Sequence, residues 1–195
     1  MNNSDTILQI PNANQMRGEL RRLRKREAVH KRIGHVVAIL LTAAAVTVLF
    51  AMLYLPMLMV VGESMTPSLS EGEIVVSLKG SKFQKGDVVA FNFNNQILVK
   101  RVIADAGEWV DIDEDGNVYV NNVLLKEPYV TEKAFGNTDI TLPYQVPDGQ
   151  IFVMGDHRAT SADSRSTSIG CISRPQIVGR ILWRIWPFNR IGIIR

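Results

Sequence analysis

A serine in an unusual local setting is the first residue that could do covalent chemistry. Ser64 lies in the segment GESMTPSL at residues 62–69, directly after a long apolar run. A serine between a glycine and a proline is usually part of a turn, and its hydroxyl needs a neighbouring base to act as a nucleophile at neutral pH. The bases outside the apolar run are His157 and the lysines. Ser64 is therefore a candidate nucleophile only if the fold brings one of them to it.

Lys100, a lysine on a predicted apolar strand face, is one such base. The Asn-Asn pair at residues 94–95 predicts a two-residue hairpin turn that pairs Val89 with Lys100 and Phe91 with Leu98. Because side chains alternate across a strand, Lys100 would share its face with apolar residues. Desolvation there lowers the pKa of a lysine toward the range that a general base needs. The alternative is an ammonium group that extends past the sheet edge into water.

A third segment, GDHRATSADSR at residues 155–165, concentrates small polar and charged side chains after an apolar run. Taken alone, it is typical of a solvated loop with local Asp–Arg pairs. The segment could contribute to catalysis only if the fold places it beside the other two segments.

Short strands must position these segments. Runs of alternating apolar and polar residues, separated by turn residues, recur through residues 62–195. This pattern predicts a mostly β domain built on an antiparallel, barrel-like sheet.

An uncharged run precedes this domain. Residues 33–62 contain no Asp, Glu, Lys or Arg, and a helix of about twenty residues crosses ~30 Å of hydrocarbon. Eight Lys or Arg residues within 1–32 precede the run, which places the N-terminus in the cytoplasm by the positive-inside rule. We therefore expect a basic cytoplasmic arm (1–32), a transmembrane signal-anchor helix (33–61) and an extracytoplasmic domain (62–195). A cleaved secretory signal has a shorter apolar region, and a buried core helix would have a polar face.

Composition excludes several classes of protein. The net charge of +3 and the mean hydropathy of +0.05 combine two parts of the chain that differ in composition. Residues 1–32 carry eight basic and three acidic residues, whereas 33–195 carry fourteen and sixteen. The domain is slightly acidic, which argues against nucleic-acid binding. The single cysteine, Cys171, excludes an intramolecular disulfide, and three histidines leave little room for a histidine metal cluster.

Taken together, the segments resemble the type I signal peptidases. Residues 64–69 (SMTPSL) resemble the nucleophile box of that family, and residues 86–89 (GDVV) resemble its Gly-Asp-(Ile/Val)-Val strand. Residues 99–103 (VKRVI), followed by Gly-Glu at 107–108, resemble the Lys-Arg box. Residues 155–165 resemble the Gly-Asp-Asn-Arg…Ser-x-Asp-Ser-Arg box. The preceding anchor and the ending Ile-Trp-Pro also fit a short, Gram-positive-like member.

The resemblance implies a role for each matching residue. Ser64 would be the acylating nucleophile, Lys100 the general base, and Ser161 the residue that orients the lysine amine. Asp163 and Arg165 would form a supporting ion pair. Met65 would line the substrate site, and residues 106–150 would be a variable cap or insertion.

The family also implies an activity and partners. It predicts a serine endopeptidase that removes signal peptides from exported preproteins after small residues in an Ala-x-Ala-like pattern. The enzyme would be a monomer in the cell membrane, with the lipid bilayer and preproteins as partners, no nucleic acid, and neither cofactor nor metal.

Departures from the family pattern leave alternatives open. His157 stands where the family more often has Asn, and Gly62 stands where some members have a hydroxyl residue that helps to bind the oxyanion. One alternative is a different serine enzyme, with a catalytic triad of Ser64, His157 and an acid. Another is a thiol enzyme that uses Cys171 with His157. A self-cleaving protease of the SOS-repressor type and an anchored, non-enzymatic binding domain are further alternatives.

Overall fold

The computed structural model describes residues 12–194 and divides into two compact units, Met1–Phe50 and Ala51–Arg195. Residues 1–11 of the expected basic arm lie outside the described residues.

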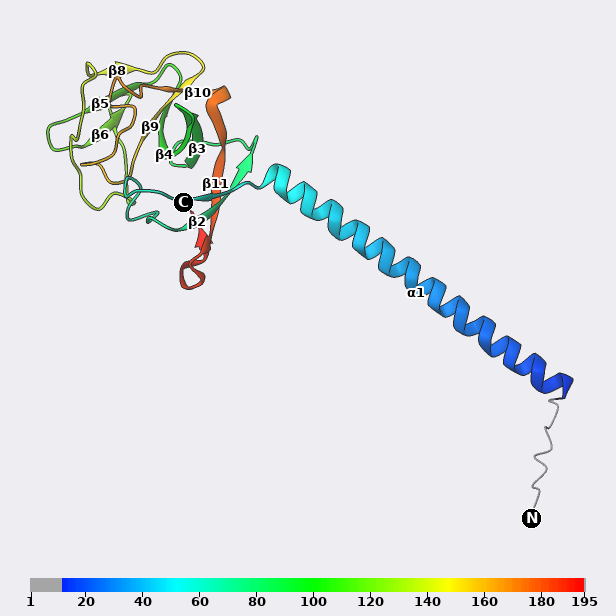
Figure 1. Ribbon diagram of the computed structural model, residues 1–195. Coiled ribbons are helices and arrows are strands. Elements are labelled where there is room, and N and C mark those ends of the chain that lie inside the picture. The colour runs from blue at the N-terminus through cyan, green and yellow to red at the C-terminus, as the bar shows by residue number, and fades with distance from the viewer. Residues whose placement is uncertain (1–11, 195) are drawn as a thin grey trace. The chain divides into compact units, whose positions relative to one another are not determined.

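The first unit contains most of one long helix, α1 (Ala13–Tyr54), whose stretch Met16–Tyr54 is long and apolar enough to cross a membrane (Figure 1). The helix differs at both ends from the expected span of 33–61. It continues through the basic residues because nothing in them breaks a helix. It ends before Pro56, since a proline lacks the N–H of the helical bond and disfavours the helical conformation in the preceding residue.

The second unit is formed by two antiparallel sheets, which confirms the mostly β fold. The larger sheet has the strand order β1-β2-β11-β3-β4-β9-β10, with β12 paired to β11. Its strands are β1 (Met57–Met59), β2 (Ile74–Lys79), β3 (Val88–Phe93), β4 (Gln96–Asp105), β9 (Gln150–Met154), β10 (Ile172–Ser173), β11 (Ile177–Trp186) and β12 (Gly192–Ile193). Short 3₁₀ turns lie at Arg174–Gln176 and Phe188–Arg190.

The smaller sheet falls within residues 106–150, the segment expected as a cap or insertion. Its strand order is β7-β6-β5-β8. The strands are β5 (Trp109–Ile112), β6 (Val118–Val120), β7 (Val123–Leu124) and β8 (Tyr144–Gln145). A cluster of buried apolar residues, including Ile103 and Phe152 of the larger sheet and Val110 and Val118 of the smaller, joins the two sheets.

The β3–β4 hairpin fixes the register of the lysine strand. Asn94 and Asn95 both have positive φ angles, 44° and 64°, as a type I′ turn requires, and asparagine tolerates this conformation better than most residues. The turn pairs Phe93 with Gln96 and, four residues further along, Val89 with Lys100. The predicted hairpin register is therefore confirmed.

Candidate active site

Ser64 is held by the apolar residues that flank it. The chain runs from β1 through Val60, which is buried, into a series of turns at residues 62–69. Met65 and Leu69 are 1% and 0% exposed and pack in the same apolar cluster as Val60. With anchors on both sides, the half-buried Ser64 has little freedom to move.

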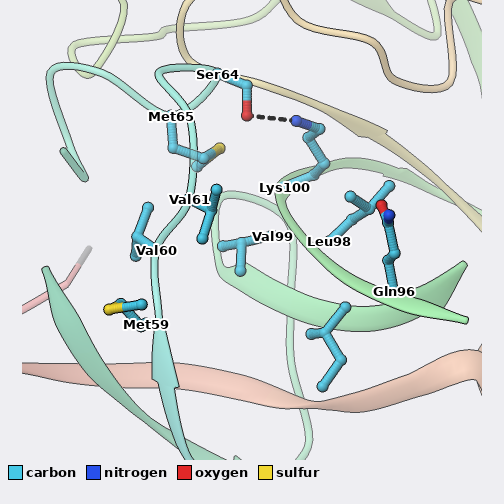
Figure 2. A pocket seen from close by; sticks show the side chains of 10 residues that line it. Met59, Val60, Val61, Ser64, Met65, Gln96, Leu98, Val99 and Lys100 are labelled. Atoms are coloured by element: carbon cyan, nitrogen blue, oxygen red, sulfur yellow. Dashed lines mark hydrogen bonds between the residues drawn. The ribbon is translucent and has the colours of Figure 1, made fainter. Parts of the chain in front are cut away.

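Lys100 meets Ser64 directly. Its Nζ lies 2.6 Å from Ser64 Oγ, within hydrogen-bond distance, and the residue is 4% exposed (Figure 2). Burial lowers the pKa of Lys100 from its usual value to about 8, because desolvation disfavours the ammonium form. The two residues lie thirty-six positions apart in the sequence, so the hairpin and the turns after β1 together create this contact.

Charges around the lysine are largely balanced. Asp163 and Asp156 raise its pKa and Arg165 lowers it, but each of these effects is smaller than that of burial. Asp163 Oδ1 accepts a hydrogen bond of 2.9 Å from Arg165 Nε, with both side chains fully buried. Asp156 is paired with Arg101 in the same way, at 2.6 and 2.8 Å. Both carboxylates therefore have an arginine partner, which weakens their pull on the proton of Lys100.

The segment 155–165 lies against Ser64, as the resemblance requires. The backbone N–H of His157 donates to the carbonyl oxygen of Ser64 at 3.1 Å. A Cβ atom at Gly155 would collide with Ser161 Oγ and with the Ser64 carbonyl oxygen, so only glycine permits this close approach. Ser161 is 2% exposed, and its Oγ has no hydrogen-bond partner within residues 12–194. The expected hydrogen bond from Ser161 to the lysine amine is thus not formed.

The residues needed by the two alternative enzymes have other contacts. The His157 ring is hydrogen-bonded to Thr160 Oγ1. Cys171 packs against the apolar cluster between the sheets, and burial raises the pKa of its thiol to about 11. A thiol with a raised pKa is a poor nucleophile at neutral pH because little of it is thiolate.

A cavity of about 440 Å³ opens beside the Ser64–Lys100 pair. One wall is the extended segment that leads to Ser64, and the other is the first half of β4 (Figure 2). Besides Ser64 and Lys100, the lining residues are Met59, Val60, Val61, Met65, Gln96, Ile97, Leu98 and Val99. Apart from Ser64 and Lys100, these residues are apolar except for Gln96, at the end of β4 away from Lys100. Met65, which the resemblance assigns to the substrate site, is one of the lining residues.

The free edge of β4 matters for peptide binding. Strand β9 pairs with β4 only from Arg101 to Asp105. Within the described chain, residues 96–100 are paired on one side only, with β3. The backbone groups on their other side are available to a further strand, as in peptide recognition by strand addition.

Sequence reasoning missed several residues near the site. It assigned no role to Arg101, Asp156, Glu127 or Arg158, which form two fully buried ion pairs. Charged residues next to apolar strand positions were the available signal, but their partners lie 55 and 31 positions away. Within residues 12–194, no group of three or more His, Cys, Asp or Glu side chains could hold a metal ion.

Comparison with known proteins adds independent findings. Residues 32–186 match the family described as "Signal peptidase, peptidase S26". The chain is 33% identical over 187 residues to signal peptidase I of Bacillus amyloliquefaciens, which covers 90% of this chain and 98% of the relative. It is 38% identical over 148 residues to signal peptidase IB of Staphylococcus aureus (strain COL), covering 66% of this chain and 76% of the relative.

A solved structure is also similar. The crystal structure of a signal peptidase I from Enterococcus faecalis V583 has 30% sequence identity and a TM-score of 0.44, and covers 51% of this chain and 97% of that chain.

Proposed function

Because the chain belongs to the S26 family of signal peptidases, we propose that it cleaves exported preproteins with Ser64 as nucleophile and Lys100 as general base. Family membership makes it a serine peptidase, a hydrolase that removes signal peptides. The observation that carries the assignment to Ser64 and Lys100 is the 2.6 Å contact between their side chains in a buried setting.

The proposed chemistry begins with neutral Lys100. Its Nζ takes the proton of Ser64 Oγ as that oxygen attacks the carbonyl carbon of the scissile peptide bond. The ammonium group then returns the proton to the leaving amine, which releases the mature protein and leaves an ester on Ser64. Lys100 then takes a proton from a water molecule as that water attacks the ester carbonyl. The ammonium group returns the proton to Ser64 Oγ as the ester bond breaks, which releases the signal peptide and restores the free enzyme.

Lowering the pKa of Lys100 makes this cycle possible near neutral pH. With a pKa of about 8, roughly a tenth of the enzyme carries a neutral lysine at pH 7, whereas an ordinary lysine near ~10.4 leaves less than about a thousandth. Arginine pairing of the nearby carboxylates supports this state.

Two further roles complete the proposed machinery. The backbone N–H of Ser64 donates to the oxyanion, since Gly62 offers no side chain for this purpose. Ser161, whose buried hydroxyl has no partner in the described chain, turns toward the lysine amine when substrate binds. The Asp163–Arg165 pair holds the segment that carries it.

The shape of the cavity supports cleavage after small residues. An extended peptide that adds to the free edge of β4 would point alternate side chains to the same side. The residues one and three positions before the cut would then both enter the apolar cavity of about 440 Å³. Small side chains fit against Met65 and Leu98, which gives an Ala-x-Ala-like preference.

Anchoring in the bilayer supports the same function. We propose that α1 spans the cell membrane once, with the basic N-terminal part in the cytoplasm and the catalytic unit outside. Trp183 and Trp186 are 46% and 45% exposed, and Phe188 is 74% exposed. Aromatic side chains favour the headgroup region, so this patch would rest on the outer surface, where a membrane-held signal peptide presents its cleavage site. The enzyme acts there as a monomer.

The proposal is tested by incubating the detergent-solubilised full chain with one secreted precursor and sequencing the new N-terminus. We expect a single cut after a small residue, with another small residue two positions earlier. The Ser64→Ala variant, purified in parallel, should leave the precursor intact. Cleavage by that variant, or no cleavage of any precursor by the wild type, would refute the assignment.

A further inference from the structure

A short segment outside the cavity contacts two buried arginines from other parts of the chain, Arg101 and Arg158. Residues 126–130 connect β7 to the turns before β8. Within them, Glu127 forms a two-pronged ion pair with Arg158, at 3.0 and 2.5 Å, and both side chains are fully buried. Tyr129 lies against the other arginine, with the Cζ atom of Arg101 3.9 Å from the centre of its ring.

Arg158 connects Glu127 to the backbone that contacts the nucleophile. Its Nε donates to the Gly155 carbonyl oxygen at 3.1 Å, and its own carbonyl oxygen accepts a bond of 2.8 Å from Arg165. Residue 157, between these two points, donates its N–H to the carbonyl oxygen of Ser64. The position of the Ser64 backbone is therefore linked to Glu127 through one buried guanidinium group.

Arg101 connects Tyr129 to the base in a parallel way. It directly follows Lys100 in β4, donates to both carboxylate oxygens of Asp156 and also donates to the Gly86 carbonyl oxygen at 2.6 Å. The Tyr129 ring covers this guanidinium, and its hydroxyl donates to Glu127 at 3.3 Å. Glu127 and Tyr129 thus contact each other and one arginine each.

We infer that Glu127 and Tyr129 are positioning residues, which set the separation of Ser64 and Lys100 by holding Arg158 and Arg101. This inference rests on the proposed function of the Ser64–Lys100 pair. Neither residue lines the cavity, so their effect is on the placement and hydration of the dyad and not on substrate contact. The inference also gives the segment between β7 and β8 of the smaller sheet a part in catalysis.

The energetics of buried ion pairs favour a geometric role. Desolvation offsets much of the attraction in such pairs, so apolar residues of similar volume often stabilise a protein as well or better. A two-pronged pair fixes both distance and angle, however, which an apolar contact does not. Burying three charged residue pairs around one serine and one lysine is understandable if it maintains their geometry.

The inference is tested with the Glu127→Gln and Tyr129→Leu variants of the full chain in non-ionic detergent. Glu132→Gln, an exposed carboxylate a few residues further on, is the matched control. We expect kcat per active site to fall by about tenfold or more at pH 7, with KM changed by less than about threefold. A looser site hydrates Lys100, so the apparent pKa of kcat/KM should rise, and the loss at pH 10 should be smaller than at pH 7.

A second variant separates positioning from charge balance. Glu127→Gln alone leaves Arg158 buried without its anion, and this could unfold the protein. The double variant Glu127→Gln/Arg158→Met removes the uncompensated charge and should restore the thermal midpoint, while kcat and the pH profile stay altered.

The outcomes are distinct. If folded Tyr129→Leu and the folded double variant both keep the wild-type kcat and pH profile, the inference is overturned, and the segment contributes only to stability. If the wild type and Glu132→Gln themselves fail to cleave precursors, the proposed function fails instead.

Discussion

Neighbouring residues on one strand serve opposite electrostatic purposes. Lys100 and Arg101 are 4% and 0% exposed, yet among the described residues only Arg101 has a carboxylate partner, Asp156. Arginine stays charged in a protein and must be paired when buried, whereas a lysine without an anion beside it loses its proton more easily. The alternation of the strand places the two side chains on opposite faces, so that Lys100 is free to act as the proposed base while Arg101 makes a fixed structural contact.

The first residue-scale prediction concerns the identity of the base. Lys100→Arg keeps the positive charge but cannot release a proton at working pH, so turnover should fall by about 10²-fold or more. We would measure single-turnover cleavage of a signal-peptide substrate, with Lys85→Arg, an exposed lysine, as the control. Retention of more than about a tenth of the wild-type rate would exclude Lys100 as the general base.

A second prediction concerns pH. Because the pKa of Lys100 is lowered to about 8 and the proposed base is the neutral form, kcat/KM should rise with pH through a value near 8 and then level off. The His157→Asn variant should keep this rising limb, since the His157 ring contacts Thr160. Rates from pH 5 to 10 would decide the matter. A limb centred near ~6.5, the usual histidine value, that disappears in His157→Asn would assign the base role to His157.

The same burial should cost stability. The pKa of Lys100 falls from 10.5 in the unfolded chain to about 8 in the folded protein. The resulting loss of stability is complete below pH 8, becomes smaller as the pH rises from 8, and is absent above pH 10.5. Lys100→Met should therefore abolish turnover while raising the free energy of unfolding at pH 7 by about 1–3 kcal/mol, at ~1.36 kcal/mol per unit. Urea unfolding at pH 7 and pH 10.5 would check this. An equal gain at both pH values would contradict the mechanism.

At the scale of elements, four paired strands present an apolar row on one face of the larger sheet. Met57 of β1 pairs with Val76 of β2, which pairs with Trp183 of β11, which in turn pairs with Ile193 of β12. Three of these side chains are 46–68% exposed, and only Val76 is buried. Large apolar side chains exposed together on paired strands often mark a contact surface, and here they support contact with lipid.

The corresponding prediction uses a matched pair of tryptophans. Trp183→Ser should weaken binding of the catalytic unit to lipid vesicles and slow the cleavage of membrane-held precursors, because a large amphipathic side chain is lost from the interface. Trp109→Ser, at the same exposure of 46% on the smaller sheet, is the control. Turnover of a short soluble peptide should be unchanged in both. Equal effects of the two substitutions on vesicle sedimentation would argue against a membrane contact at Trp183.

At the scale of the whole molecule, the long helix ends earlier than the uncharged run suggests. The helix ends at Tyr54, and the next residues are part of the catalytic unit. Strand β1 pairs with β2, the buried Val60 packs beside Met65, and Val61 lines the cavity. The last apolar residues before Ser64 therefore form a wall of the cavity beside Ser64 and Lys100.

Two truncations test this boundary. Removal of residues 1–54 should leave a folded, active unit, whereas removal of residues 1–61 takes away β1 and the buried Val60 and should lower the free energy of unfolding by about 2 kcal/mol or more. The shorter product should also cleave peptides at a much reduced rate, because one wall of the cavity is gone. Circular dichroism melting curves and peptide turnover in detergent would compare them. Equal stability and activity would show that β1 is dispensable.

The sequence by itself determined the features that depend on near neighbours. An uncharged run of this length predicts a helix fit for a bilayer, and alternation with turn residues predicts antiparallel strands. The Asn94–Asn95 turn specifies the β3–β4 register, because a two-residue loop leaves no other pairing. The order of the quoted segments also indicated the family, and with it Ser64 and Lys100.

Only the tertiary structure decided which distant groups meet. The pairing of Glu127 with Arg158, the placement of Tyr129 on Arg101 and the cavity between residues 59–65 and 96–100 join segments far apart in the chain. Local patterns carry no information about such contacts. A charged residue beside an apolar strand gives the same sequence pattern whether its side chain is solvated or paired. The partner is chosen when the two sheets pack, because burial then makes an unpaired charge too unfavourable to remain.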